Sequence, residues 1–544
     1  MENRLVPRLN GFAEAFVAQV EKRRIWFLAG FSMLYLAVTC LVASHKPLWN
    51  DEFYTLYIAR LPGIPEVWAA LATGAEQIPP FFYVLTRASL ALSGQQQATA
   101  GSHPRHYFEL SLRLPGVIGF WVMSLCLFRF VSKRAPAVYG FLAMLFPLVT
   151  GAYYYASEAR PYGLVLGFSG LALLCWQAAT ERDNRLLPLA GLALSLAAAV
   201  SCHYYAVFVF IPLAFAEAVR SFLRRRLAWA VWAAFSLGAT PLLAFLPLIQ
   251  RAMAYSSTFW SKSQWTSVPE FYYFLLAPAT LPLVALLVLS AIYPSPVGQV
   301  ENPSYPFSDD QYPPAPRLHE MAAAIGFMAI PIVAVALSII LTGAFTDRYA
   351  LPAVIGCSVI IAFAAHRLSS DRPAIAAILT FSLCAFFLSL GLKSVMNSLA
   401  IREARTQTIE FLRSDSAGGI NDLPIAVSDQ HAFTSLAHYA PRDVASRLVY
   451  LADPDKALHH LGHNSVEKGA LDLLKPWFHL PVEEYGPYLA SRRRFLVYGS
   501  PGHFLNWLLS DLTSSGMHIE LRSRDKDSLL FLVNPEQAQS TTRH

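Results

Sequence analysis

Residues 25–57 read IWFLAGFSMLYLAVTCLVASHKPLWNDEFYTLY, an apolar run followed closely by an acidic pair. The run 25–44 carries no charged residue, and about 20 residues rising about 1.5 Å each match a hydrocarbon layer about 30 Å thick. Basic residues precede the run at 22–24, whereas Asp51 and Glu52 follow it. The stretch therefore predicts a membrane-spanning helix that delivers two carboxylates to the opposite face of a bilayer.

The composition extends this interpretation to most of the chain. Of its 544 residues, 55% are hydrophobic and only 14% are charged, whereas roughly a quarter are charged in soluble proteins. The net charge of +6 comes without a basic stripe interleaved with aromatic residues, so nucleic-acid binding is not expected. We predict a polytopic α-helical membrane protein with about eleven transmembrane helices, at 25–44, 112–131, 136–154, 162–179, 186–202, 206–221, 227–248, 272–293, 320–343, 349–366 and 373–393.

The basic residues orient these spans. Clusters of lysine and arginine fall on every second loop, and such clusters mark the cytoplasmic face. We therefore expect 1–24 in the cytoplasm, 25–394 in the membrane and 395–544 outside, in a periplasm-like space. Within the outer loop 45–111, the apolar stretch 77–94 begins near two prolines and contains an arginine. This pattern predicts an interfacial or re-entrant helix, with a full span as the alternative. The chain has no N-x-[ST] acceptor, which favours the inner (plasma) membrane of a bacterium.

From about residue 395 the sequence is typical of a small soluble domain. Short β-rich runs alternate with helical patterns, and a helical pattern at 503–513 separates two of the runs, as in a βαβ layer. The stretch 294–318, rich in proline and acidic residues, predicts a flexible cytoplasmic connection. We expect a C-terminal periplasmic α/β domain with strands at 424–428, 447–451, 494–498, 518–522 and 529–533.

Polar side chains that are costly near lipid gather on the outer face once the spans are oriented. Ionisable groups at membrane depth are expensive unless they serve a cavity or a partner. One shared, water-filled site would explain them together. The candidates come from four separate segments, and they are Asp51, Glu52, Glu158, Arg160, Tyr162, His203, Tyr204 and Arg348.

Each group also has an ordinary structural explanation. The acidic pair after the first span could be solvated loop, and Glu158 with Arg160 could form an interfacial salt bridge. His203 could be packed in the interior, and Arg348 could anchor the chain to headgroups. The joint pattern favours function, because other residues defined the topology that brings the four groups to one face.

The candidate residues suit group transfer from a phosphate. The planar guanidiniums of Arg160 and Arg348 match phosphate oxygens, and a carboxylate, Asp51 or Glu52, can take a proton from an attacking hydroxyl. Adjacent residues point in different directions, so one carboxylate is expected to be the base while the other orients it or binds substrate. A phosphate leaving group needs charge stabilisation rather than a proton. These parts fit transfer of a sugar from a lipid phosphate, with inversion in a single displacement.

Six motifs carry a resemblance to a known family, and they are WNDE, QIPPFFYVL, SLRLPGVIGF, YYYASEARPYGL, SCHYYAVF and DRYALP. They resemble, in the same order, motifs of the bacterial members of glycosyltransferase family 39 (dolichyl-phosphate-mannose-protein mannosyltransferase-like). These are multi-span enzymes of the GT-C fold, related to protein O-mannosyltransferases and to the aminoarabinose transferases of lipid A. The resemblance covers roughly 25–395, with WNDE and YASEARPY as its specific parts.

The resemblance implies a function. Such enzymes take polyprenyl-phosphate-linked sugars as donors, act on the outer face and invert configuration. On this resemblance Asp51 would be the general base, Glu52 the second member of the acidic pair, and Arg160 part of an outer-loop motif near the donor. The chain departs from the family by QIPP, where many relatives have histidine before the prolines, and by Ser157, where glutamine is common. The departures bear on the identity of donor or acceptor and not on the reaction class.

The acceptor stays open among a lipid, a glycan and a protein, and membrane lipids are the other expected partners. No cofactor is expected with certainty: all six cysteines lie in or at the ends of apolar runs, and neither the D-x-D at 453–455 nor HHLGH at 459–463 is a specific metal signal. We predict no metal site, although a divalent metal requirement stays open. The alternatives are a multi-span transporter, for which no half-to-half symmetry is visible, and a catalytically inactive membrane scaffold.

Overall fold

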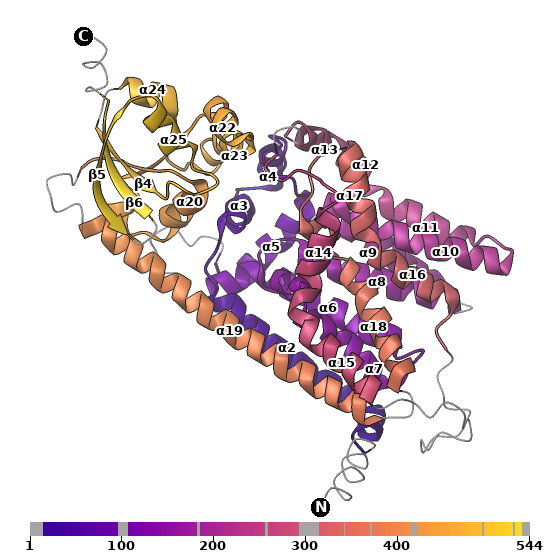
Figure 1. Ribbon diagram of the computed structural model, residues 1–544. Helices are drawn as coiled ribbons and strands as arrows, with labels where there is room; N and C mark the ends of the chain where they lie inside the picture. Colours follow the sequence, from indigo (N-terminus) through magenta and orange to yellow (C-terminus); the bar gives the residue numbers. More distant parts are fainter. Residues whose placement is uncertain are drawn as a thin grey trace, which may run out of the picture.

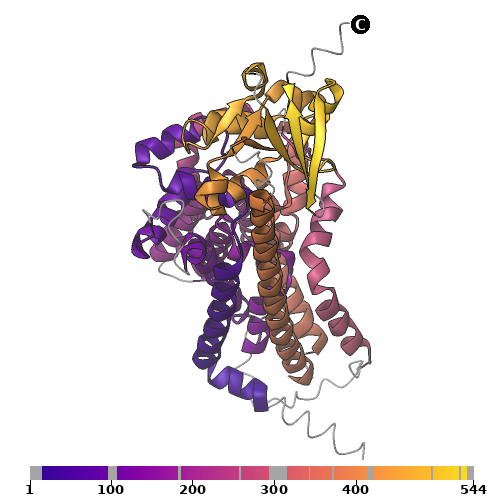
Figure 2. The same ribbon diagram turned by 90° about the vertical axis from the view of Figure 1, so that its left-hand side faces the viewer.

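The computed structural model describes residues 15–95, 107–181, 185–255, 259–292, 315–341, 343–369, 373–414, 422–491, 494–525 and 528–535 (Figure 1). These residues form a bundle of helices and a smaller α/β domain. Most of the expected connection 294–318 lies outside the described residues. In Figure 2 the α/β domain, in yellow, lies at one end of the bundle, and the indigo start of the described chain lies at the other.

The helical part follows the expected spans. Each of the expected spans overlaps at least one helix. Among the described residues, six helices are long and apolar enough to cross a membrane, and up to nine are if each bent pair counts as one span. The elements are α2 (Arg24–His45), α3 (Asn50–Ala59), α4 (Ile64–Leu71), α5 (Pro80–Leu92), α6 (Phe108–Val131), α7 (Ala137–Leu145), η2 (Phe146–Val149), η3 (Gly151–Ser157), α8 (Tyr162–Glu181), α9 (Leu186–Cys202), η4 (Tyr204–Val209), α10 (Phe210–Arg224), α11 (Trp229–Ala239), α12 (Pro241–Ala244), α13 (Leu246–Met253), α14 (Ser267–Leu276), η6 (Ala277–Ala279), α15 (Thr280–Ile292), α16 (Leu318–Met328), α17 (Ile330–Leu341), η8 (Asp347–Ala350), α18 (Ala353–Ser369) and α19 (Pro373–Ser414).

Three of the expected spans are bent. Hydropathy indicates that a segment is apolar enough to cross a membrane but not whether its helix axis is straight. The sequence pattern therefore did not predict the bends. Pro331 lies at one of them, and proline removes a helical hydrogen bond and clashes with the preceding turn. The expected interfacial stretch 77–94 forms α5, a 13-residue helix that begins at the second of its two prolines. The bends are 77° between Ala137–Val149 and Gly151–Ser157, 62° between Trp229–Ala244 and Leu246–Met253, and 48° between Leu318–Met328 and Ile330–Leu341.

Helices α6 and α8 approach closely because glycines line their contact. A Cβ added at Gly119 would lie 2.4 Å from the carbonyl oxygen of Gly163, and one added at Gly163 would lie 2.4 Å from that of Gly116. Small residues allow helix backbones to approach in this way within a membrane. The contact holds the start of α8, and the functional segment just before it, against α6.

The C-terminal domain contains a six-stranded mixed sheet. Its strand order is β3-β2-β1-β4-β6-β5, with β3, β2, β1 and β4 parallel and β6 antiparallel to both neighbours. The five expected strands are confirmed, whereas β3 was missed because its sequence VEE is short and mostly charged. The elements are β1 (Ile425–Val427), α20 (Gln430–Tyr439), α21 (Arg442–Ala445), β2 (Leu448–Ala452), α22 (Pro454–Leu461), α23 (Ser465–Gly469), η10 (Ala470–Leu474), β3 (Val482–Glu484), α24 (Tyr485–Ala490), β4 (Phe495–Gly499), α25 (Trp507–Ser514), β5 (His518–Asp525) and β6 (Ser528–Asn534).

Helix α25 connects β4 to β5 and starts later than the helical pattern predicted at 503–513. The side chain of Asn506 accepts a hydrogen bond from the backbone N–H of Leu509 at 3.1 Å and so caps the helix there. Strands β4 and β5 point the same way, but β6 is inserted between them.

Helix α19 joins the two parts of the molecule. It is 42 residues long and passes through the boundary expected at 394, because good helix formers continue through 399–414 without glycine or proline. In Figure 1 it lies along α2.

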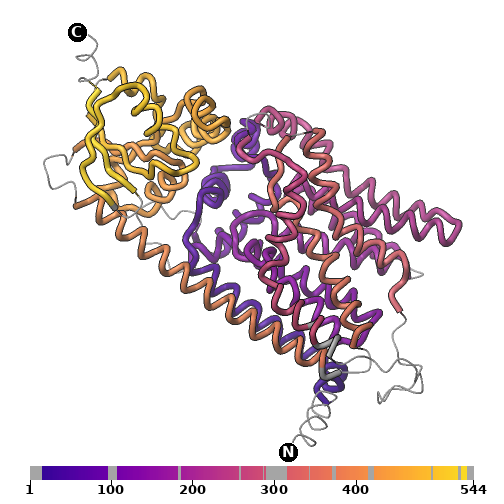
Figure 3. The backbone as a smooth tube through the Cα atoms, in the orientation of Figure 1, coloured from indigo at the N-terminus to yellow at the C-terminus, as the bar shows by residue number. Residues whose placement is uncertain are grey.

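Helix α20 of the C-terminal domain rests on α3, which lies between this domain and the bundle (Figure 3). The Gln430 amide donates to the Tyr54 hydroxyl at 2.7 Å, and Thr434 Oγ1 donates to Asn50 Oδ1 at 3.2 Å. One apolar cluster runs from α3 to α5 into the sheet. The C-terminal domain thus packs directly on the helix that begins with the acidic pair.

Candidate active site

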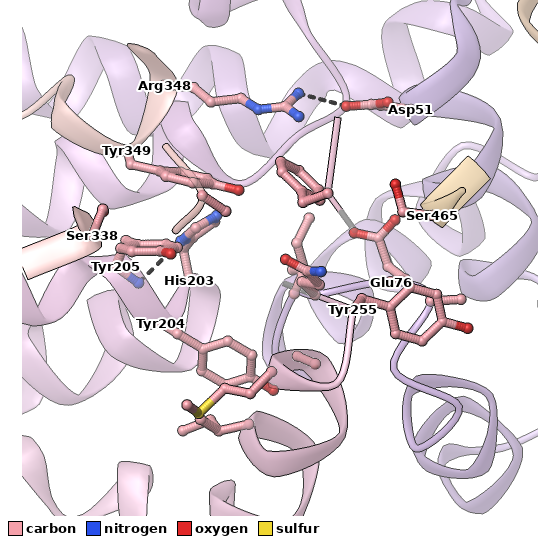
Figure 4. A pocket seen from close by; sticks show the side chains of 18 of the residues that line it. Asp51, Glu76, His203, Tyr204, Tyr205, Tyr255, Ser338, Arg348, Tyr349 and Ser465 are labelled. Atoms are coloured by element: carbon pink, nitrogen blue, oxygen red, sulfur yellow. Dashed lines mark hydrogen bonds and ion pairs between the residues drawn. The ribbon is translucent and has the colours of Figure 1, made fainter. Parts of the chain in front are cut away.

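A cavity of about 560 Å³ lies where the four segments that carry the predicted site residues meet (Figure 4). Its polar lining comes from α3, the segment before α5, the segment before α8, η4 and η8. Its apolar lining comes largely from α12, α13 and α17. Six of the predicted site residues line the cavity, and they are Asp51, Arg160, Tyr162, His203, Tyr204 and Arg348.

Asp51 lies in the first turn of α3, with 20% of its side chain exposed. Its Oδ2 is 2.5 Å from Arg348 Nη1 and 3.9 Å from Arg160 Nη2. Burial alone would raise the pKa of Asp51, but the guanidiniums of Arg348 and Arg160 outweigh burial and hold the pKa below its ordinary value. The carboxylate is therefore ionised at neutral pH and faces the cavity.

Arg160 is held by a carboxylate that the sequence analysis missed. Its Nη2 donates to Glu76 Oε1 at 3.1 Å and its Nη1 to Glu76 Oε2 at 3.5 Å, and Nη1 also donates to the backbone oxygen of Asp51 at 3.0 Å. Glu76 directly precedes QIPP, the motif in which this chain differs from the family it resembles. That difference was the one feature of the sequence that could have drawn attention to Glu76. The fork of Arg160 thus bridges two acidic residues at the cavity wall.

Glu52 does not line the cavity. Its side chain is fully buried, with Oε1 accepting from Arg113 Nε at 2.7 Å and Oε2 from Arg113 Nη2 at 2.6 Å. The backbone N–H of Ala159 also donates to Oε1, at 2.6 Å. Burial would raise the pKa of Glu52, but the charge of Arg113 outweighs it and lowers the pKa. Glu52 therefore joins α3 to α6 and to the segment that carries Arg160.

Glu158 also lies outside the cavity lining. It is fully buried, and its Oε1 is 3.0 Å from Lys46 Nζ. The Lys46 ammonium in turn lies 3.7 Å from the centre of the Tyr154 ring. These contacts join the end of the first span to the segment before α8. The two glutamates among the candidates thus form buried ion pairs behind the cavity.

His203 lies in an aromatic cluster with tyrosines of the cavity wall. Its ring centre is 5.3 Å from that of Tyr162 and 5.4 Å from that of Tyr349. Burial, together with the nearby cations, lowers the pKa of His203 to about 3, so the imidazole is neutral. Nδ1 accepts from the backbone N–H of Tyr205 at 3.2 Å, which leaves the proton on Nε2. His203 can therefore donate a hydrogen bond but does not supply positive charge.

The C-terminal domain completes the cavity. Gln430 at the start of α20, and Ser465 and Val466 of α23, belong to the lining. Across the same interface, the Tyr255 hydroxyl contacts Asp472. No motif in the sequence signalled these residues, because their role depends on how the two parts pack.

The two discounted metal signals have structural roles. Asp453 caps α22, with Oδ1 accepting from the backbone N–H of Asp455 at 3.1 Å and of Lys456 at 3.0 Å. His460 Nε2 lies 3.0 Å from Asp511 Oδ1. In the part of the chain that the structure describes, no group of three or more His, Cys, Asp or Glu side chains is arranged to hold a metal ion.

Comparisons of the sequence with protein-family models and with curated proteins gave no match. Solved structures are similar in three dimensions. ArnT from Cupriavidus metallidurans bound to undecaprenyl phosphate has a TM-score of 0.54 at 11% identity, covering 93% of this chain and 98% of that one. The apo state of the same ArnT has a TM-score of 0.53 at 13% identity, with the same coverage. The chain is therefore a membrane protein with the GT-C fold of ArnT and a small C-terminal sheet domain.

Proposed function

We propose that the protein is an inverting glycosyltransferase that moves a sugar from a polyprenyl-phosphate-linked donor to a hydroxyl of a lipid, glycan or protein acceptor. The observation that carries the proposal is Asp51 beside Arg348 and Arg160, in a cavity that also has an apolar lining. The fold likeness to ArnT bound to undecaprenyl phosphate supports a polyprenyl-phosphate ligand. In this proposal the bundle lies in a bacterial inner membrane, with the N-terminus cytoplasmic and the C-terminal domain periplasmic.

In the proposed reaction Asp51 acts as general base. One carboxylate oxygen takes the proton of the acceptor hydroxyl while the hydroxyl oxygen forms a bond to the anomeric carbon. The bond from that carbon to the phosphate oxygen breaks, and its electron pair leaves on the polyprenyl phosphate. Arg348 and Arg160 neutralise the charge that develops there. Attack opposite the leaving group inverts the anomeric centre.

Donor binding would also activate the base. In the structure the charge of Arg348 holds the pKa of Asp51 low, which makes the carboxylate a weak base. A donor phosphate that shares the guanidinium of Arg348 would reduce this effect, so the pKa of Asp51 would rise towards a more useful value. The buried ion pair of Glu52 with Arg113 would hold α3 in place while Arg348 moves from Asp51 towards the donor phosphate.

Replacing Arg348 by glutamine is expected to alter the pH dependence of turnover. The base is available above its pKa and is lost as the pH falls through it, and wild-type Asp51 has a lowered pKa. The acid limb of kcat/KM in the wild type is therefore expected below the ordinary range for aspartate, whereas Arg348→Gln should shift the limb to higher pH. A pH profile of kcat/KM, which reports the free enzyme, measures the shift. An unchanged acid limb would contradict the pairing of these two residues.

The decisive test is a turnover assay on the purified full chain in lipid. A panel of polyprenyl-phosphate-linked sugars serves as donors, and a membrane extract serves as acceptor. Release of polyprenyl phosphate together with attachment of the sugar supports the proposal. Donor binding without turnover by any donor of the panel, or movement of the lipid across the bilayer without cleavage, would instead favour a scaffold or a transporter.

A further inference from the structure

The sheet of the C-terminal domain has a topological switch point, and one residue beside it, Gln430, lines the cavity. Strand β1 lies between β2 and β4, so the chain leaves the sheet in opposite directions from the carboxyl ends of β1 and β4. In open α/β sheets, ligands bind outside the carboxyl ends of strands at such a point. Here the segment 428–431 follows β1 and the segment 500–506 follows β4.

These two segments present a cluster of rings. The ring centre of His431 lies 6.4 Å from that of His503 and 6.1 Å from that of Phe504, and the rings of His503 and Phe504 are 4.8 Å apart. Phe504 is 58% exposed. We call His431, His503 and Phe504 the acceptor surface.

His431 connects the acceptor surface to the neighbourhood of Asp51. His431 follows Gln430, whose amide contacts Tyr54, and precedes Thr434, whose hydroxyl contacts Asn50. The first turn of α20 thus packs on the first turns of α3, where Asp51 lies. The charges of His431 and Asp51 act on each other's pKa, which places the two side chains within electrostatic reach.

We propose that the acceptor surface binds the carbohydrate part of the acceptor and presents one of its hydroxyls to Asp51. The proposal rests on the proposed function, since it needs Asp51 as the base. The exposed face of Phe504 can pack against the apolar C–H face of a sugar ring, and imidazole nitrogens can donate to and accept from sugar hydroxyls.

The electrostatics favour a neutral, hydroxyl-rich ligand at this surface. Burial lowers the pKa of His431, although Asp51 and Asp429 oppose the shift, and His503 adds to it. The imidazole of His431 is therefore uncharged at neutral pH. Asp51 is already paired with Arg348, so the carboxylate near His431 that opposes an anionic group is that of Asp429. The two arginines of the cavity lie at Asp51 and Glu76, and the donor phosphate is expected beside them rather than at His431.

A binding experiment on the full chain in lipid nanodiscs tests the acceptor surface. The probes are soluble oligosaccharides of hexose and hexosamine units, with Ser/Thr-containing peptides of similar size for comparison, followed by saturation-transfer NMR. Phe504→Ala is expected to weaken oligosaccharide binding about tenfold, which corresponds to the loss of an aromatic contact of about 1.4 kcal/mol. Phe504→Trp keeps a flat ring and should retain binding.

Matched variants separate the surface from general effects. Leu521→Ala truncates a side chain on β5 that is 51% exposed, and His459→Ala removes an exposed imidazole elsewhere in the domain; both should bind like the wild type, whereas His431→Ala should lose affinity. Equal binding by Phe504→Ala and the wild type, or binding of the peptides alone, would overturn the proposal. Oligosaccharide binding that depends on Phe504, in a chain that cleaves no donor, would overturn the glycosyltransferase and leave the carbohydrate site standing.

Discussion

Asp51→Asn is expected to lower turnover by about 10³-fold, because general-base catalysis contributes typically 10² to 10⁴. The amide keeps the size of the side chain but cannot take the proton of the acceptor hydroxyl. Donor binding should persist, since Arg348 and Arg160 then lack the charge of Asp51 and interact more freely with the donor phosphate. The measurement is the rate of polyprenyl phosphate release with saturating donor, beside a separate determination of donor affinity.

Asp347→Asn is the matched control for this loss. Asp347 precedes Arg348 in η8 but does not line the cavity, so its variant should keep turnover within about twofold of the wild type, as expected for a carboxylate outside the reaction. A variant at Asp51 that keeps more than a tenth of the wild-type rate, with an unchanged melting temperature, would rule out this residue as the base.

Arg113→Met is expected to destabilise the fold by about 3–5 kcal/mol. The substitution leaves the carboxylate of Glu52 fully buried without its cation, and it removes the hydrogen bonds that Arg113 donates to the backbone oxygens of Ala43 and Pro47. Thermal unfolding in detergent, followed by the loss of helical signal, measures the effect. The double variant Arg113→Met with Glu52→Leu should recover part of the stability, because no buried charge is then unpaired.

An exposed ion pair between the end of α19 and α21 provides the comparison. The side chains of Arg413 and Asp443 are about half exposed, and Arg413 Nε lies 2.7 Å from Asp443 Oδ2. Solvent therefore screens their attraction. Arg413→Ala should leave the unfolding temperature nearly unchanged. If Arg113→Met were as mild as Arg413→Ala, the buried pair would not hold α3 to α6 as the structure indicates.

The sequence predicted much of the candidate site, because charge near lipid is informative. Once the basic loops had oriented the spans, four of the cavity residues could be assigned to the same face of the membrane protein, and they are Asp51, Arg160, His203 and Arg348. The sequence could not say which of the adjacent carboxylates faces the cavity, since this depends on the rotation of α3, which is fixed by the pairing of Glu52 with a distant arginine.

Other features depend on contacts between distant segments. Glu76 is a single acidic residue in a polar loop, and only its two hydrogen bonds to Arg160 distinguish it. Gln430 belongs to an ordinary amphipathic helix and reaches the cavity because α20 packs on α3. The bends in the helices also could not be predicted. Hydropathy is averaged over a window of residues, so it indicates that a segment is apolar but not whether the helix axis changes direction within it.

The continuous helix α19 fixes how the C-terminal domain is rotated relative to the bundle. At about 1.5 Å per residue, 42 residues extend for about 63 Å, roughly twice the hydrocarbon thickness. One residue inserted in the half of α19 nearer the C-terminal domain would rotate that domain by about 100° about the helix axis and shift it by about 1.5 Å along the axis. Such a turn would carry Gln430 away from Tyr54 and open the cavity wall. The length of α19 is therefore tied to the packing of α20 on α3.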